Sequence, residues 1–217
     1  MILSASLLGA DLFRLPAELD VLEKAEKTWL HIDVMDGYFA PNLSFGPGIV
    51  KQIKKHTGLF LDVHLMVQKP ELFVGQFLDA GADAVTFHVE ADGTTEDKRK
   101  LLNSIRERGC LAGVALASES RKEILEPYLE AVDLALITFC PLGFGGGQRE
   151  EKNAEKVLWL QKKRQEKGYR YRISVDGGMT PENSKALGAD VIVSGSYLFQ
   201  EDMAERLKRF QIEEKGE

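Results

Sequence analysis

Short apolar runs alternate with longer amphipathic segments along the whole chain. The runs are rich in Val, Ile and Leu, which is typical of buried strands, and the segments between them carry apolar residues at helical spacing. This alternation indicates repeated βαβ units and a parallel sheet. We predict strands at Ile2–Ser6, Thr28–Val34, Leu59–Leu65, Ala84–His88, Leu111–Leu116, Leu134–Phe139, Tyr171–Val175 and Val191–Ser194.

The predicted helices fill the gaps between these strands, and several begin near Pro, Ser or Thr. Two segments end at a glycine just ahead of the next strand, at Gly81 and at Gly188. Eight such strand-helix units in 217 residues predict an α/β fold, a (β/α)8 TIM barrel, with residues 1–217 forming a single domain. The helical segments include Pro16–Lys27, Pro70–Ala80, Thr95–Arg108, Lys122–Ala131 and Glu150–Lys167.

Side chains of the kind that bind metals stand at the ends of three predicted strands. His31 and Asp33 lie two residues apart on one strand, so both project to the same side of it. A second strand ends in Asp62-Val63-His64, and Asp176 directly follows a third. Active sites of TIM barrels lie at the carboxyl ends of the strands. We therefore predict that two histidines and two carboxylates form one site for a divalent metal ion.

The other two of the four histidines carry a weaker signal. His88 ends the fourth predicted strand, ahead of Glu90, and both a supporting role at the site and a purely structural role are open for it. His56 lies in a lysine-rich helical stretch, and we expect it at the surface.

Glycine-rich stretches follow the last three predicted strands. Glycine allows backbone N–H groups to close around a phosphate without a Cβ atom in the way. Loops after the seventh and eighth strands hold phosphate in many barrels of this fold. We therefore predict a small phosphorylated substrate. The stretches are Gly143-Phe144-Gly145-Gly146-Gly147-Gln148, Gly177-Gly178 and Gly195-Ser196.

Composition and charge exclude several classes of protein. The net charge of −6 is mild and the basic residues lie mostly on predicted helices, so we expect no nucleic-acid partner. No basic segment followed by an apolar core begins the chain, and the apolar runs are too short to span a membrane, so we expect a cytoplasmic enzyme without a membrane partner. Cys110 and Cys140 should lie at opposite ends of a barrel and stay unpaired.

The order of the motifs resembles that of ribulose-phosphate 3-epimerases. The resemblance covers nearly the whole chain, and the run from His31 to Asn42 is highly specific. It implies a metal-dependent isomerase of the pentose phosphate pathway that interconverts D-ribulose 5-phosphate and D-xylulose 5-phosphate. The matching stretches are Ser6-Leu7-Leu8-Gly9-Ala10-Asp11-Leu12, His31 through Gly37, Phe39-Ala40-Pro41-Asn42, Asp62-Val63-His64-Leu65-Met66, Gly143-Phe144-Gly145-Gly146, Val175-Asp176-Gly177-Gly178 and Val193-Ser194-Gly195-Ser196.

The resemblance also implies a role for each matched residue. One divalent ion per chain (Zn, Fe, Mn or Co) would be held by His31, Asp33, His64 and Asp176. The two aspartates would exchange the C3 proton through a metal-stabilised enediolate. Pattern alone would place Met35 and Met66 in the core. Family members form dimers or hexamers, so a homo-oligomer is expected. Implied substrate contacts are Ser6, His64, Met35, Met66, Gly143, Gly145, Gly146, Gly177, Gly178, Gly195 and Ser196.

Three features depart from the family pattern. The loop after the sixth strand lacks a proline before Gly143 and gains a glycine before Gln148. Thr138 takes the place of a methionine. The segment 181–189 is shortened, so the seventh helix should be little more than one turn.

Two other functions stay open from the sequence. One is an epimerase acting on D-allulose 6-phosphate, and the other is a non-catalytic barrel that binds a sugar phosphate. A sugar-phosphate decarboxylase with the motif Asp-x-Lys-x-x-Asp is disfavoured, because Met35 stands at the lysine position.

Overall fold

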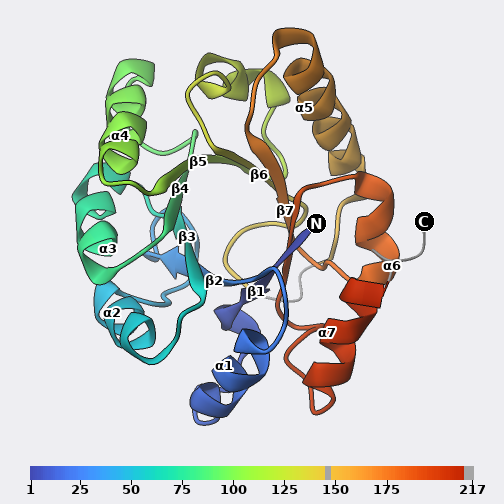
Figure 1. Cartoon of the computed structure of the whole chain (residues 1–217). Coiled ribbons are helices and arrows are strands. Elements are labelled where there is room, and N and C mark those ends of the chain that lie inside the picture. Colours follow the sequence, from blue (N-terminus) through green and yellow to red (C-terminus); the bar gives the residue numbers. More distant parts are fainter. Residues whose placement is uncertain (145–147, 213–217) are drawn as a thin grey trace.

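Parallel strands close into a barrel in chain order, and helices surround it (Figure 1). The computed structural model describes residues 1–144 and 148–212. Within these ranges each strand pairs with its neighbour in sequence, and the last pairs with the first, so the predicted TIM barrel is confirmed. The strands are β1 (Ile2–Ser6), β2 (Thr28–Met35), β3 (Phe60–Met66), β4 (Ala84–His88), β5 (Leu111–Leu116), β6 (Leu134–Thr138), β7 (Arg172–Asp176) and β8 (Val191–Ser194).

The surrounding helices agree with the prediction in place but differ in length and type. The predicted helix Pro16–Lys27 ends early, at Glu23. The predicted segments 70–80 and 150–167 each begin with a separate 3-10 turn. The seventh helix is a single short turn, as expected. The helices are α1 (Leu15–Glu23), α2 (Pro47–His56), α3 (Val74–Ala80), α4 (Thr95–Glu107), α5 (Ala154–Lys167), α6 (Pro181–Ser184) and α7 (Met203–Ile212), with 3-10 helices at Leu7–Gly9, Pro70–Leu72, Lys122–Tyr128, Glu151–Asn153 and Lys185–Leu187.

The predicted helical segment Lys122–Ala131 is helical but shorter and of a different type. The segment Lys122–Tyr128 is a 3-10 helix, and Pro127 lies inside it. Proline has no N–H to donate and its ring clashes with the preceding turn of an α-helix, so the tighter and shorter form results.

Alternation of side chains along the strands divides the core in two. One set points outward, as Leu30 and Ile32 of β2 do, and packs under the helices in the main hydrophobic cluster. The other set points into the barrel. At the amino ends of the strands, Trp29 stacks on Phe60 with ring centroids 4.2 Å apart, and Arg172 lies over Trp29. Trp29 and Phe60 form an apolar plug together with Ala84, Leu134 and Val191.

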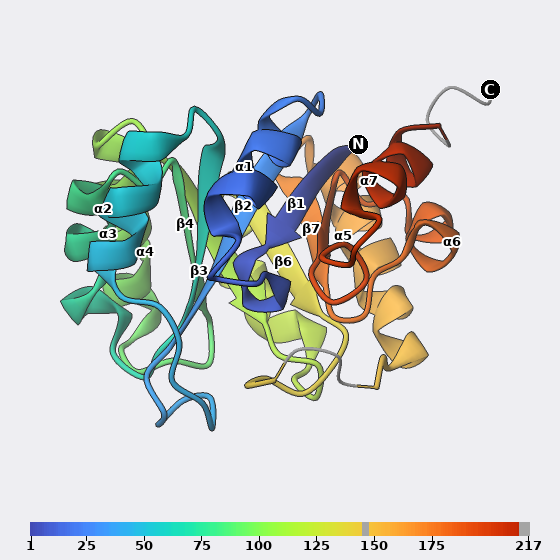
Figure 2. The same ribbon diagram turned by 90° about the horizontal axis from the view of Figure 1, so that it is seen from below.

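At the opposite end of the barrel polar side chains such as Asp33 and Asp176 lie beside apolar ones such as Met35 and Met66, and loops extend beyond them. Figure 2 shows that the long loops after β2 and β6 leave the barrel at the same end. None of the helices in the described ranges is long and apolar enough to span a membrane. Cys110 and Cys140 are both free thiols, as expected.

Candidate active site

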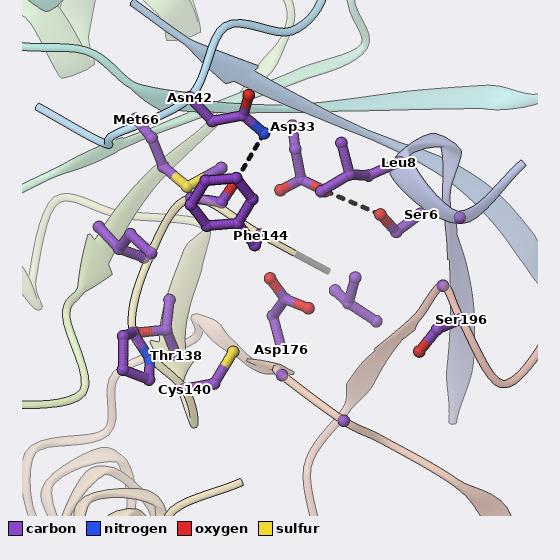
Figure 3. Close-up of a pocket in the computed structure, with 18 of the residues that line it drawn as sticks. Ser6, Leu8, Asp33, Asn42, Met66, Thr138, Cys140, Phe144, Asp176 and Ser196 are labelled. Atoms are coloured by element: carbon purple, nitrogen blue, oxygen red, sulfur yellow. Dashed lines mark hydrogen bonds between the residues drawn. The ribbon is translucent and has the colours of Figure 1, made fainter. Parts of the chain in front are cut away.

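A cavity of about 370 Å³ opens at the carboxyl ends of the strands. This volume is in the range of small-molecule sites. Figure 3 shows Asp33 and Asp176 facing each other across it. The predicted site residues Gly145 and Gly146 lie outside the described residues. The other predicted residues that line the cavity are Ser6, Asp33, Met35, Met66, Gly143, Asp176, Gly177, Gly178, Gly195 and Ser196.

Four side chains can hold a metal ion: Asp33 and Asp176 line this cavity, whereas His31 and the predicted substrate contact His64 are buried and do not line it. His31, Asp33, His64 and Asp176 each offer one ligand atom, and these atoms lie within 4.8 Å of one another. The strands β2, β3 and β7 supply them, because alternation places residues two apart on the same inner face. The first three are buried and Asp176 is half-buried. The residues that the sequence predicts as ligands are therefore brought together.

His31 presents a bare nitrogen to this cluster. Its Nδ1 lies 2.8 Å from Oδ2 of Asp62, which also accepts a hydrogen bond from Ser4 Oγ at 3.0 Å. Because a carboxylate only accepts, Nδ1 carries a proton, and in the neutral ring the lone pair is on Nε2. That Nε2 is buried, lies 3.3 Å from Oδ1 of Asp33, and has no hydrogen-bond partner among the described residues. A buried nitrogen of this kind fits a metal ligand.

The charge balance around His31 also favours a cation. Burial alone lowers the pKa of His31, but the carboxylates of Asp33 and Asp62 outweigh burial and raise that pKa well above its ordinary value. A positive charge is thus stabilised between these groups. Two imidazoles and two carboxylates form a donor set that suits Zn²⁺, Fe²⁺, Mn²⁺ or Co²⁺.

Asp33 is held firmly in place. Ser6 Oγ donates to its Oδ2 at 2.7 Å, and Ser44 Oγ donates to its backbone oxygen at 2.6 Å. Burial raises the pKa of Asp33, but the neighbouring His31 and His64 outweigh it and hold the pKa well below its ordinary value. Asp33 is therefore ionised.

Asp176 shows the opposite behaviour. Burial and the charge of Asp33 raise its pKa to about 7. A pair of carboxyl groups with pKa values driven apart provides one group that accepts a proton and one that donates it.

His64 and His88 form a second buried pair. His64 Nδ1 lies 3.1 Å from Oδ1 of Asp33, and its Nε2 lies 2.9 Å from Nε2 of His88. His88 Nδ1 in turn lies 3.3 Å from Oε2 of Glu90. His88 thus contacts a member of the cluster, whereas His56 is exposed, as expected.

Glycines at the mouth of the cavity allow neighbouring segments of backbone to approach each other closely. A Cβ atom on Gly9 would lie 2.6 Å from the carbonyl carbon of Gly195, so the loops after β1 and β8 touch through backbone alone. Gly177 has φ of +110°, and a Cβ atom there would lie 2.9 Å from Sγ of Cys140. Both positions require glycine.

A hydrogen bond joins two loops at the mouth of the cavity. Asn42 Nδ2 donates to the backbone oxygen of Gly143 at 2.7 Å, as drawn in Figure 3. This hydrogen bond links the loop after β2 to the loop after β6, where Phe144 is 63% exposed.

Sequence reasoning gave no supporting role to Ser4, Asp62 or Ser44. A signal existed for Asp62, which lies two residues before His64 and so shares its face of β3. No signal existed for Ser44, because its contact with Asp33 depends on how the loop folds back.

Comparison with known proteins places these residues in a family context. The sequence model of the "Ribulose-phosphate 3 epimerase family" matches residues 2–199. The ribulose-phosphate 3-epimerase of Treponema pallidum (strain Nichols) is 42% identical over 200 residues, covering 91% of this chain and 90% of that protein. The chloroplastic ribulose-5-phosphate-3-epimerase of Arabidopsis thaliana is 40% identical over 212 residues, covering 96% of this chain and 75% of that protein.

Solved structures with a similar fold are more distant in sequence. The 3-hexulose-6-phosphate synthase of Salmonella typhimurium aligns with a TM-score of 0.72 over 100% of both chains, at 19% identity. The 3-keto-L-gulonate-6-phosphate decarboxylase of Vibrio cholerae O1 biovar El Tor str. N16961 aligns with a TM-score of 0.68 at 13% identity, covering 98% of this chain and 95% of that one. At these identities the likeness extends to the fold alone.

Proposed function

The chain belongs to the ribulose-phosphate 3-epimerase family, and we propose that it inverts C3 of D-ribulose 5-phosphate to give D-xylulose 5-phosphate by proton transfer between two aspartates. The observation that carries this proposal is the placement of Asp33 and Asp176 on separate strands with their carboxyl groups facing each other across one cavity. Inversion beside a carbonyl requires a group on each side of a planar intermediate. Two facing carboxyl groups meet that requirement.

The proton transfers follow from this geometry. The ionised aspartate removes the proton from C3, and the electron pair of the broken C–H bond moves into an enediolate spanning C2 and C3. The other aspartate, in its acid form, delivers its proton to the opposite face of C3. In the reverse direction the two residues exchange roles. Ser6, which donates to Asp33 at 2.7 Å, keeps that carboxylate oriented during the transfer.

The four-residue cluster His31, Asp33, His64 and Asp176 would hold the divalent cation of the reaction. The orphaned, buried Nε2 of His31 supports this assignment. A divalent cation bound there supplies electrostatic stabilisation of the negative charge that develops on the oxygens of C2 and C3.

The phosphate of the substrate would bind at the glycine loops after β7 and β8. Gly177, Gly178, Gly195 and Ser196 line one side of the cavity that also contains the two aspartates. Loops at these two positions hold phosphate in many TIM barrels. Met35 and Met66, which are paired on the neighbouring strands β2 and β3, would pack against the carbon chain of the sugar.

A coupled assay for conversion of D-ribulose 5-phosphate tests the proposal on protein with a known metal content, with D-allulose 6-phosphate assayed in parallel. We expect pentose turnover that stops on chelation and returns with Zn²⁺, Mn²⁺ or Fe²⁺. Asp33→Asn and Asp176→Asn should each abolish turnover, and Asp20→Asn on the outer helix α1 should not. Incubation in deuterated water should place deuterium at C3. Ligand binding without this exchange would show a sugar-phosphate-binding barrel and contradict the proposal.

A further inference from the structure

We propose that Glu90, acting through His88, fixes the proton arrangement of His64 and thereby sets the affinity of the His31, Asp33, His64 and Asp176 cluster for its cation. This inference rests on the proposed function, since it concerns the same site. It assigns two positioning residues, Glu90 and His88, neither of which lines the cavity.

The contacts run in one line from the cluster to a carboxylate outside it. His64 Nε2 lies 2.9 Å from His88 Nε2, and His88 Nδ1 lies 3.3 Å from Glu90 Oε2. Two nitrogens at 2.9 Å need one proton between them, because two lone pairs or two protons would repel. The direction of each hydrogen bond along this line therefore depends on the groups at its two ends. The inner one is Asp33, whose Oδ1 lies 3.1 Å from His64 Nδ1, and the outer one is a carboxylate outside the cluster.

Glu90 is that end group, and it only accepts. Its other oxygen, Oε1, accepts a hydrogen bond from the backbone N–H of Ala117 at 2.9 Å. Burial raises the pKa of Glu90, but its contacts with His88, Ser120 and Ala117 lower that pKa to about 2, so the group is an anion. The charges of the buried Lys98 and Lys156 interact favourably with it. The carboxylate is thus fixed in position, in charge and in hydrogen-bond direction.

A fixed acceptor at Glu90 favours one set of proton positions. In its neutral form the fully buried His88 carries one proton. Glu90 Oε2 favours that proton on Nδ1, which leaves His88 Nε2 bare and able to accept from His64 Nε2–H. The lone pair of His64 Nδ1 is then available to a cation that Asp33 Oδ1, 3.1 Å away, also binds. That is the arrangement a metal-binding imidazole needs.

The competing proton arrangement satisfies Asp33 in place of Glu90 and leaves His64 Nδ1 without a lone pair for a cation. If His64 donated Nδ1–H to Asp33, its bare Nε2 would need a proton from His88 Nε2. His88 Nδ1 would then direct a lone pair at the Glu90 carboxylate. His31 is oriented in the parallel way, because Asp62 holds its proton on Nδ1. Two outer carboxylates, Asp62 and Glu90, thus each favour the proton arrangement in which an imidazole nitrogen near Asp33 can bind a cation.

Glu90→Gln is the most informative variant, because it keeps the shape and removes the charge. With its amide nitrogen toward His88, the glutamine would face Nδ1–H donor to donor. With the amide nitrogen toward Ala117, it would face a backbone N–H. We expect the affinity for Zn²⁺, measured by competition with a chromophoric chelator, to fall about 10- to 100-fold. Glu23→Gln is the matched control: that carboxylate accepts the N–H of Gly58 at 2.6 Å, away from the cavity, and we expect no change.

A pair of His88 variants separates the hydrogen bond from packing. His88→Phe keeps a ring but has no acceptor for His64 Nε2–H, and it should lose zinc affinity as Glu90→Gln does. His88→Gln supplies a carbonyl oxygen and should retain more affinity than His88→Phe. Circular dichroism of each variant establishes that it is folded. In nitrogen-15 NMR spectra of the Zn²⁺-loaded wild-type protein, His88 should carry its proton on Nδ1.

The outcomes distinguish this inference from the proposed function. Wild-type protein that turns over the sugar without binding a divalent cation would overturn the metal site and this inference together. Wild-type protein that binds Zn²⁺ while Glu90→Gln and His88→Phe bind it equally well would overturn the inference alone. A proton on Nε2 of His88 in the loaded protein would do the same.

Discussion

Replacing Asp176 with asparagine should abolish activity and yet stabilise the chelated protein. Burial and the charge of Asp33 raise the pKa of Asp176 from 3.8 to about 7. A carboxyl group with a raised pKa favours the fold while it is protonated, and that advantage is lost as the pH rises from the ordinary value through the raised one. At pH 8 the lost stability amounts to about 4 kcal/mol at most. Asparagine is uncharged, as the protonated acid is, so the variant does not lose this folding stability as the pH rises.

The sign of the effect can be tested against pH and against the partner residue. The advantage of Asp176→Asn should be absent below about pH 4, grow between pH 4 and 7, and level off above that. Asp33→Asn should have the opposite effect, because the pKa of Asp33 is held low and its charge is stabilised by His31 and His64. It should destabilise the chelated protein by about 2 kcal/mol, since it removes hydrogen bonds to a charged acceptor.

Urea unfolding followed by circular dichroism, in chelator at pH 5 and at pH 8, measures both effects. A gain of about 1 kcal/mol corresponds to a rise of roughly 2–4 °C in the melting temperature of a chain of this size. With saturating Mn²⁺ the order should reverse, because the wild-type protein is stabilised by its ligand and the variant lacks one carboxylate. If Asp176→Asn is less stable than wild type at pH 8, or if its gain in stability is equal at both pH values, the raised pKa of Asp176 is not the cause and the prediction is wrong.

Three further predictions concern the surroundings of the cavity. Asp62→Asn weakens the hydrogen bond to His31 Nδ1 and should lower zinc affinity about tenfold or more in a chelator competition, with the fold retained. Unchanged affinity would contradict the role given to Asp62. Asn42→Ala removes the hydrogen bond to Gly143, worth about 1 kcal/mol, and should raise KM for the sugar phosphate about fivefold with little change in melting temperature; a constant KM would show that the link between the loops is not needed for binding. Gly9→Ala places a Cβ atom 2.6 Å from a backbone carbon and should cost about 1–3 kcal/mol in thermal unfolding, whereas Gly48→Ala meets no atom within 4 Å and should not.

The local parts of this structure could be predicted because they depend on short-range geometry. A period of two along β2 is enough to place His31 and Asp33 on one face, and the barrel then brings Asp176 to the same end. Supporting contacts could not be predicted in this way. The contact between Ser4 and Asp62 joins residues 58 positions apart, and it depends on the register of strands that a single sequence does not specify.

The errors in the helices have a similar cause. Lys122–Tyr128 has helical composition, and the single residue Pro127 decides its type. The last helix, α7, is held by the packing of Met203, Leu207 and Phe210 against the main core. Tertiary contact outweighs local propensity at such positions.

The apolar plug at the amino ends of the strands has a consequence for how this enzyme can change over time. Trp29, Phe60 and their neighbours bury their surface far from the loops that line the cavity. Residues that hold the barrel closed and residues that contact the sugar therefore belong to separate ends of the same strands. Mutations accumulating in the mouth loops can alter substrate preference while the plug preserves the fold. Libraries aimed at new ketose phosphates should vary the mouth and leave the plug untouched.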